Sequence, residues 1–319
     1  GFEVKRFDGS DLSEAFEEAE RIEQELTPSS TRSPFDFQLE SGLLYNSNVA
    51  LTPLSRELSP AEPESFQFFV APELEYRIVN GSEWRAGPTF NGYFNLNEGN
   101  HNNLNLLNYT PGLFVERRTE GARAIHLTRI QYDYTHEEFD GNAFGNRNAV
   151  TLSNTAYWNR RNVSHFYWSA DFTDFASDGV ISSITSRDGW TNTVGLSHAF
   201  YPECWYLYSL RVGVDLQFAD VEGSDFSYNG VNLFSKANLP LTQTVSLVLG
   251  LGWGYRDYFD FEFTPSRNEN IWRGSLELEK QLNDSLAVAA VFNYDRFDSE
   301  NVLFEAERFV TGVVLRYKY

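Results

Sequence analysis

The five histidines of this chain are the imidazoles that a hydrolytic site could use as a general base, and Cys204 is its one thiol. His136 is followed directly by Glu137 and Glu138, so it is the best candidate for a general base in a hydrolytic site. Neither a G-x-S-x-G elbow nor an H-E-x-x-H zinc motif accompanies it. Cys204, in the segment YPECWY, has no evident histidine partner, and we interpret it as a structural thiol. The sequence therefore predicts no enzyme, no catalytic or metal-binding residue and no cofactor, and a hydrolase remains a third hypothesis.

Carboxylates are concentrated in polar stretches between the apolar segments, at 57–64, 137–140, 257–262 and 298–305. Such stretches could hold Ca²⁺ or Mg²⁺, bridge lipopolysaccharide through those ions, or receive a cationic partner. None of them has the spacing of a calcium-binding loop. The simpler interpretation is that they are solvated loops.

A further set of charged side chains recurs at alternate positions of otherwise apolar segments. The set is Glu40, Glu73, Glu75, Arg77, Arg85, Arg129, Asp133, Asp171, Arg211, Asp215, Arg273, Glu277, Glu279, Arg308 and Arg316. A period of two places these residues on one face of each strand, opposite Phe, Leu and Val. Two interpretations remain open: the charges line a lumen and discriminate between permeants, or they pair with one another across strands and keep the interior hydrated.

Composition narrows the class of protein that could carry these strands. The chain has 319 residues, 25 basic and 45 acidic side chains, a net charge of −20, 16% aromatic residues and one cysteine. The negative charge argues against nucleic-acid binding. The aromatic content excludes a disordered acidic chain, and the single cysteine excludes a disulfide scaffold. A charged fraction of 22% excludes a helical membrane protein.

The chain from residue 35 onwards reads as about fourteen alternating segments of 10–15 residues. Even the uncharged stretch 237–255 alternates, with Val245, Leu247, Leu249 and Leu251 on one parity, and is therefore a strand rather than a helix. The separators alternate between short turns and longer polar stretches. The longer ones are 46–64, 97–102, 136–147, 174–188, 258–269 and 296–305.

Two folds accommodate such strands: a soluble sandwich that buries the apolar faces, and a membrane barrel that turns them to lipid. The length of the segments favours the barrel, because a tilted spanning strand needs about 9–11 residues. Tryptophans near strand ends agree with two interfacial belts. These belts, with the terminal tyrosine, are Trp84, Trp158 and Trp205 beside short turns, Trp190, Trp253 and Trp272 beside long connections, and Tyr319. We predict an all-β fold: a transmembrane antiparallel up-and-down β-barrel of about 14 strands.

The first 34 residues differ from the rest. Leu12, Phe16, Ala19, Ile22 and Leu26 recur at helical spacing, which predicts an amphipathic helix over 11–27. We therefore divide the chain into an N-terminal segment, 1–34, expected in the periplasm, and a barrel domain, 35–319.

Both ends of the barrel domain resemble known bacterial proteins. The terminal ERFVTGVVLRYKY alternates up to its final Tyr319, and it resembles the closing strand of outer-membrane barrels, which is read by the barrel-assembly machinery. Val314 stands where that pattern usually has Gly. The opening FQLESGLLYNSNVAL, residues 37–51, resembles barrels linked to tetratricopeptide repeats, namely surface lipoprotein assembly modifiers and exopolysaccharide-export barrels.

These resemblances imply a Gram-negative outer-membrane protein in contact with lipid and lipopolysaccharide, and no nucleic acid. The first functional hypothesis is a porin-like transport channel that passes a solute or polymer through a polar lumen. The second is a non-conducting scaffold barrel that anchors or sheathes a periplasmic or surface protein partner.

Overall fold

The computed structural model describes residues 33–49, 64–177, 179, 181–202 and 204–319. The helix expected over 11–27 lies outside these residues, as does most of the segment 1–34. The strands are β1 (Phe35–Asn46), β2 (Ser65–Tyr76), β3 (Val79–Asn80), β4 (Trp84–Asn97), β5 (Leu106–Glu120), β6 (Ile125–Phe139), β7 (Asn142–Asn159), β8 (Asn162–Phe175), β9 (Gly189–Phe200), β10 (Ser209–Val221), β11 (Tyr228–Pro240), β12 (Val245–Asp257), β13 (Asn268–Asn283), β14 (Leu286–Ser299) and β15 (Ala306–Lys318). Three short helical segments complete the described elements: η1 (Gly99–Leu104), α2 (Ser182–Thr185) and η2 (Val302–Phe304).

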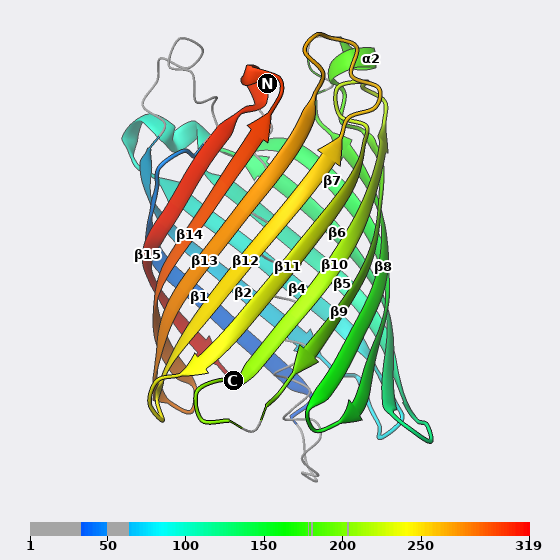
Figure 1. The fold of residues 1–319 in the computed structure, drawn as a ribbon, viewed down its shortest axis with the longest axis vertical. Helices are drawn as coiled ribbons and strands as arrows, with labels where there is room; N and C mark the ends of the chain where they lie inside the picture. Colours follow the sequence, from blue (N-terminus) through cyan, green and yellow to red (C-terminus); the bar gives the residue numbers. More distant parts are fainter. Residues whose placement is uncertain (1–32, 50–63, 178, 180, 203) are drawn as a thin grey trace.

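The strands close into one antiparallel ring (Figure 1). Each strand pairs with its neighbour in sequence, and β1 also pairs with the last strand, β15. Along β4, the partner of Thr89 is Glu75 and the partner of Ala86 is Val79, so the three residues 76–78 face the two residues 87 and 88. That offset is a bulge, and β2 and β3 together form one strand of the ring. The predicted barrel of 14 strands is confirmed.

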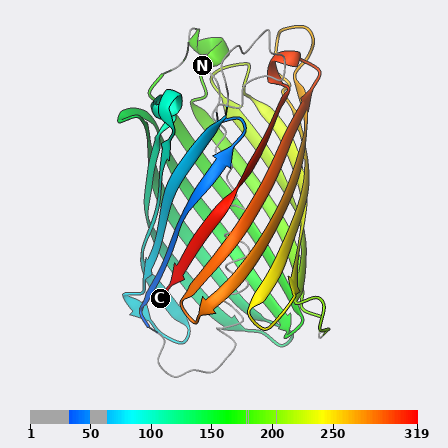
Figure 2. The same cartoon turned by 90° about the vertical axis from the view of Figure 1, so that its left-hand side faces the viewer.

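The tilt of the strands is visible in side view (Figure 2), where β1, β2 and β15 cross the wall obliquely. In a closed cylinder each strand is shifted along its neighbour, and this stagger tilts all the strands relative to the barrel axis. Because each connection is a hairpin, connections alternate between the two ends. The end that carries β1's first residue and β15's last residue has the short turns, and the opposite end has most of the long ones.

Large apolar side chains cover the outside of the ring. Leu43, Leu113 and Leu251 have exposed fractions of 67%, 62% and 69%, far above what a dry sandwich core would leave. Buried apolar side chains form only small clusters among the described residues, such as Ile271 with Phe297 and Ala306. Many polar side chains, by contrast, are buried. The pattern is the reverse of a soluble β-sandwich, and it follows the alternation along each strand.

One expected connection is wrong. Residues 136–147 were expected to form a long polar loop, but β6 and β7 continue through them as a paired ladder to a tight turn at Asp140 and Gly141. Gly141 has φ 75°, a conformation that glycine adopts without strain. The polar residues of this segment misled the prediction, because a hairpin that extends past the ring has polar residues on both faces. No helix in the described part of the chain is long and apolar enough to span a membrane.

Candidate functional site: the charged interior of the barrel

The charged residues found by alternation share the face opposite to the exposed leucines. The register carries this face from strand to strand: Glu40 lies opposite Arg316, Arg85 opposite Glu116, and Arg273 opposite Asp295. Contacts between strands that are not neighbours identify this face as the concave one, because such side chains can meet only across the inside of a cylinder. Their role as the lining of a conducting lumen stays a prediction.

Arg316 on β15 is the centre of the most exposed cluster. Its guanidinium donates to Glu40 on β1, to Glu277 on β13, and to Glu279 on β13 at 2.7 Å. The bonds to β13 pass over the intervening strand β14, where Ala287 is the register partner of Arg316. The small alanine side chain leaves the space that the arginine occupies. Three carboxylates around one guanidinium give the cluster a net charge of about −2.

A second network runs along the inner face from β1 to β6, in the half of the ring nearer the short turns. Arg129 on β6 donates to Glu75 on β2 at 2.8 Å, across β4 and β5. Its guanidinium also lies 3.9 Å from the centre of the Phe114 ring. Glu75 accepts a further bond of 2.8 Å from Arg77, which lies 3.7 Å from Asp36. The network ties four strands of the ring together through their inner faces.

Two ion pairs between neighbouring strands of the wall are almost completely buried. Arg308 donates to Asp295 at 2.9 Å, and Arg85 donates to Glu116 at 3.2 Å. Each pair joins register partners on neighbouring strands. Because both members are buried, their charges cancel locally and are screened little by water. They hold neighbouring strands together more than they present charge to a solute.

The remaining predicted residues also share the inner face, and Arg211 among them is only 4% exposed. Asp133 accepts two bonds of 2.9 Å from Gln131. A Cβ at Gly195 would overlap both the Tyr167 ring and the Asp215 carboxylate, so glycine makes room for these two groups. Glu73, Asp171, Arg211 and Arg273 also follow the inner parity of their strands.

A ladder of amides, which charge counting missed, lines the inner face near the long-connection end. Asn46 donates to Gln67 at 3.3 Å, and Gln67 donates to Asn97 at 2.6 Å. Asn97 in turn donates to the backbone oxygen of Leu104 in η1. Alternation of uncharged polar residues with Phe and Leu was the available signal. The ladder fastens η1 to three consecutive strands.

The long connections on one side of the mouth converge on Arg267, which is only 2% exposed. Arg267 donates to Glu269 at 2.9 Å and to the backbone oxygen of Asp225 at 2.7 Å. Its guanidinium lies 3.8 Å from the ring centres of Tyr258 and Phe304. One side chain therefore joins the β10–β11, β12–β13 and β14–β15 connections.

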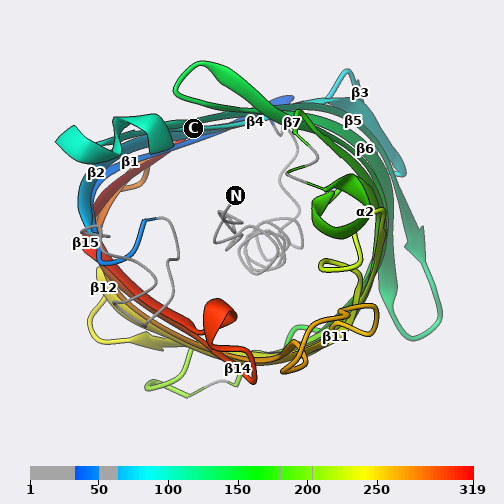
Figure 3. The same cartoon turned by 90° about the horizontal axis from the view of Figure 1, so that it is seen from above.

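A second fastening lies between the β8–β9 and β10–β11 connections. Backbone N–H groups of Gly223, Ser224 and Asp225 donate to carbonyls of Ser186, Ser183 and Ile184 at 3.1 Å each. A Cβ at Gly223 would overlap backbone atoms of Ser186 and Ile184, so only glycine permits this approach. Seen from above, α2 lies inside the outline of the ring (Figure 3). The fastened connections narrow the mouth on that side.

Asp225 is a titratable group of this fastened region. Its Oδ1 atom is buried and has no hydrogen-bond partner among the described residues. Burial raises the pKa of the Asp225 carboxyl above its usual value, Arg267 acts to lower that pKa, and the Glu262 carboxylate acts to raise it. The ionised carboxylate is therefore destabilised in the folded loop.

The structure places the enzymatic candidates His136 and Cys204 in different elements, β6 and the β9–β10 connection. His136 lies within β6 on the outer face, where Nδ1 is 2.7 Å from Asn146 Oδ1 and Nε2 is 3.1 Å from Glu138 Oε1. The Cys204 thiol lies 3.6 Å from the carbonyl of Leu207. No group of three or more His, Cys, Asp or Glu side chains within the described ranges could hold a metal ion.

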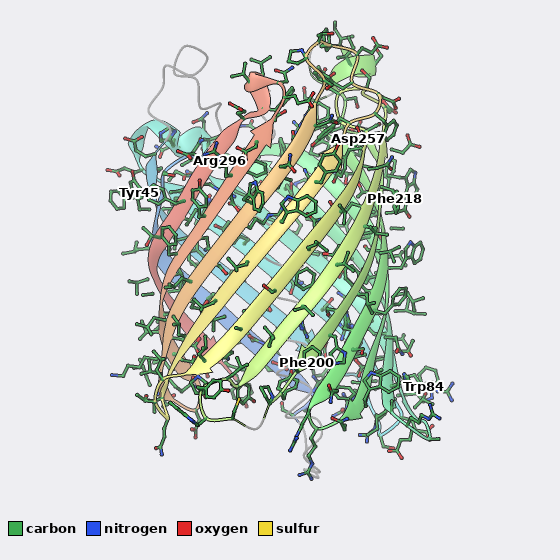
Figure 4. The ribbon with its side chains drawn as sticks, in the orientation of Figure 1. Tyr45, Trp84, Phe200, Phe218, Asp257 and Arg296 are labelled. Atoms are coloured by element: carbon green, nitrogen blue, oxygen red, sulfur yellow. The ribbon has the colours of Figure 1, made fainter. Side chains whose placement is uncertain are left out.

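The predicted interfacial aromatics lie near the two ends of the ring. Trp84, Trp158 and Tyr319 lie at the short-turn end and Trp190 near the other, where Tyr45 and Phe218 also lie; Figure 4 labels residues at both levels. Trp253 and Trp272 are register partners in the half of the wall nearer the long connections. Trp205 belongs to the 201–208 connection rather than to a strand, because β10 begins only at Ser209. Their contact with lipid headgroups stays a prediction.

No family model and no curated protein sequence matches the chain. Solved structures do match it. The outer membrane channel DcaP of Acinetobacter baumannii is 8% identical, with a TM-score of 0.51 over 89% of this chain and 97% of that one. An outer membrane channel from Pseudomonas putida F1 is 10% identical, with a TM-score of 0.47 over 92% and 98%. Omp33, an outer membrane protein of A. baumannii, is 12% identical, with a TM-score of 0.41 over 89% and 97%. By its likeness to DcaP, the chain has the closed antiparallel barrel fold of outer-membrane proteins.

Proposed function

We propose that this chain is a channel of the bacterial outer membrane, which passes a hydrophilic solute or polymer through its interior. The supporting observation is the pairing of an exposed apolar outer face with a charged inner face in a closed ring. Fourteen strands leave an interior wider than side chains alone fill, because an eight-stranded barrel is just filled. The fold shared with DcaP, a channel, supports the same function.

The proposed orientation places the short turns in the periplasm and the long connections outside the cell. In bacterial barrels, periplasmic turns are short and extracellular loops are long. The chain then enters the barrel from the periplasmic side, because β1 starts at that end. Contact with lipopolysaccharide, and recognition of the closing strand β15 by the barrel-assembly machinery, belong to this proposal. The opening-strand resemblance to tetratricopeptide-linked barrels favours a periplasmic partner for the same end.

Cations are the permeant class that the interior favours. The Arg316 cluster carries three carboxylates to one guanidinium, and its side chains keep exposed fractions between 22% and 39%. The arginines of the two buried pairs, Arg85 and Arg308, are only 11% and 6% exposed, so they contribute little field to a passing ion. Lys236 also acts on Glu277, so the five side chains carry a net charge of about −1. The accessible field near Arg316 is therefore weakly negative.

Planar-bilayer recording of the purified chain tests this function. Discrete conductance steps, with a reversal potential in a KCl gradient that indicates cation preference, are the expected result. Membranes that contain correctly folded barrel, identified by heat-modifiable gel mobility, but show no conductance would contradict the channel. That result would favour the scaffold hypothesis instead. Hydrolysis of added lipid or peptide that is lost on His136→Ala would support the hydrolase.

A further inference from the structure

Four exposed arginines lie in two neighbouring hairpins at the short-turn end of the barrel. Arg117 lies near the end of β5, Arg123 in the β5–β6 turn, and Arg160 and Arg161 in the β7–β8 turn. We call these four residues the arginine patch. Glu120 is bonded to Arg118 at 3.2 Å, and Glu83 lies in the adjoining β3–β4 connection. With Arg118, five arginines therefore stand beside two carboxylates in the described part of these connections. In a chain with a net charge of −20, this is a local excess of positive charge.

Two tryptophans place the arginine patch at the level of the aromatic belt. The Arg117 guanidinium lies 5.2 Å from the ring centre of Trp84, which points away from the barrel at its lower edge in Figure 4. Trp158, which precedes Arg160 by two residues, is also exposed. Tryptophan and arginine side chains with an apolar body and a polar end settle where headgroups meet the acyl region.

The outer wall beside the patch carries hydrogen-bonding groups instead of Leu and Val. His198 Nδ1 lies 2.9 Å from Ser164 Oγ, which also accepts a 2.9 Å bond from Trp158 Nε1. His126 Nδ1 lies 3.2 Å from Asn154 Oδ1. Although these groups bond to one another, such polar side chains are less costly at the level of the hydrated headgroups than among acyl chains. The polar strip extends the arginine patch over β6, β7, β8 and β9.

We propose that the arginine patch and this strip bind the phosphate groups of anionic phospholipids in the leaflet at the short-turn end. The proposal rests on the membrane insertion proposed above. Guanidinium groups bind phosphate oxygens through paired, charge-assisted hydrogen bonds. An anionic headgroup such as phosphatidylglycerol is favoured over phosphatidylcholine because only the former carries net charge to complement the patch. The opposite end lacks this complement, since its connections are rich in carboxylates.

Native mass spectrometry tests the proposal, with folded barrel in detergent and an equimolar mixture of phosphatidylglycerol and phosphatidylcholine. The patch variant is Arg123→Gln/Arg160→Gln. Its matched control is Lys280→Gln/Arg296→Gln, which removes two exposed positive charges from the outer surface elsewhere. Wild type and control should bind phosphatidylglycerol preferentially. The patch variant should lose about fivefold or more of that preference, because each arginine near an anionic surface contributes about that factor.

Equal preference in patch variant and control overturns the proposal, and so does a wild type without preference. Heat-modifiable mobility is measured on the same samples. Folded barrel without lipid preference overturns the patch alone, whereas a chain that never folds into detergent or lipid contradicts the membrane barrel as well. A salt titration needs no variant: the wild-type preference should fall as salt rises from about 0.1 M to 1 M, and a salt-independent preference would exclude an arginine–phosphate origin.

Discussion

Glu75 on β2 accepts a 2.8 Å hydrogen bond from Arg129 on β6, although β4 and β5 stand between their strands. The bond spans the inside of the curved wall directly instead of following the wall from strand to strand, and we call it the chord. It links parts of the chain that are 54 residues apart in sequence, and it does so with two charges that are each about one-eighth exposed. The pair forms because the wall curves enough to bring Glu75 and Arg129 together, so it depends on the shape of the wall as well as on the two charges.

Removing one partner of this chord should destabilise the barrel more than removing both. Glu75→Gln takes from the partly buried Arg129 the carboxylate that it bonds, and Arg129→Gln takes one of its two bonded arginines from Glu75. In the double variant no charge of the pair remains, so the two single effects should not add. A double-mutant cycle in urea unfolding from lipid vesicles should give a coupling energy of about 1–3 kcal/mol. Additive effects would contradict the chord.

The carboxylates around Arg316 should set the ion preference of the channel. Glu277→Gln and Glu279→Gln should each reduce the cation-to-anion permeability ratio, by at most about fivefold, because a unit charge at 4 Å in water contributes about 1 kcal/mol. The measurement is the reversal potential in a KCl gradient. Glu138→Gln is the control, because Glu138 bonds to His136 on the outer face of the ring. An equal shift of the reversal potential in the control would show that the Arg316 cluster does not set the ion preference.

Arg267 should hold the three connections that it contacts. Arg267→Met leaves Glu269, which is 2% exposed, as a buried charge without its guanidinium, at a local cost of about 3–5 kcal/mol. Amide hydrogen exchange should therefore speed up in 222–227, 258–267 and 300–305, while the ladder between β1 and β15 remains protected. The double variant Arg267→Met/Glu269→Gln removes the buried charge and should recover part of the protection. Unchanged exchange in the single variant would refute this role.

Gly223 should be required for the narrowed mouth. A valine there would meet backbone atoms of Ser186 and Ile184, which cannot move aside as a flexible side chain would. Gly223→Val should separate the two connections and increase the rate of tryptic cleavage after Arg187. Gly274→Ala is the control, because a Cβ at Gly274 meets no atom within 4 Å. Identical cleavage rates in the two variants would mean that the close approach does not fasten the mouth.

Asp225 should make the fastened connections more stable in acid. Because the folded pKa of Asp225 lies above its ordinary value, protonation favours the folded loop. The contribution is complete below the ordinary pKa of about 3.9 and is lost as the pH rises through the folded pKa. Asp225→Asn should therefore stabilise the loops at pH 7, by less than about 1 kcal/mol because the group is partly exposed, and have no effect near pH 3. The measurement is amide hydrogen exchange in these loops between about pH 3 and pH 7. A variant that gained stability only in acid would contradict the expected direction.

The sequence by itself determined the architecture, because a strand has a side-chain period of two and a barrel wall has two unlike sides. Alternation around Glu277 and Arg316 placed both residues on the inner face before any register was known. The number of strands followed from counting segments and turns. Polar residues near His136 suggested a loop, since a hairpin extending beyond the ring loses the apolar face on which the counting depends.

Which charges meet was decided only by the tertiary structure. The period assigns Glu75 and Arg129 to one face but says nothing of their separation, which depends on stagger, closure and curvature together. Arg267 had no place in the strand pattern, because it lies just before β13 and its partners come from three connections. Contacts across the inside of a closed barrel join residues that are distant in the chain. Local sequence patterns therefore cannot predict which of these residues meet.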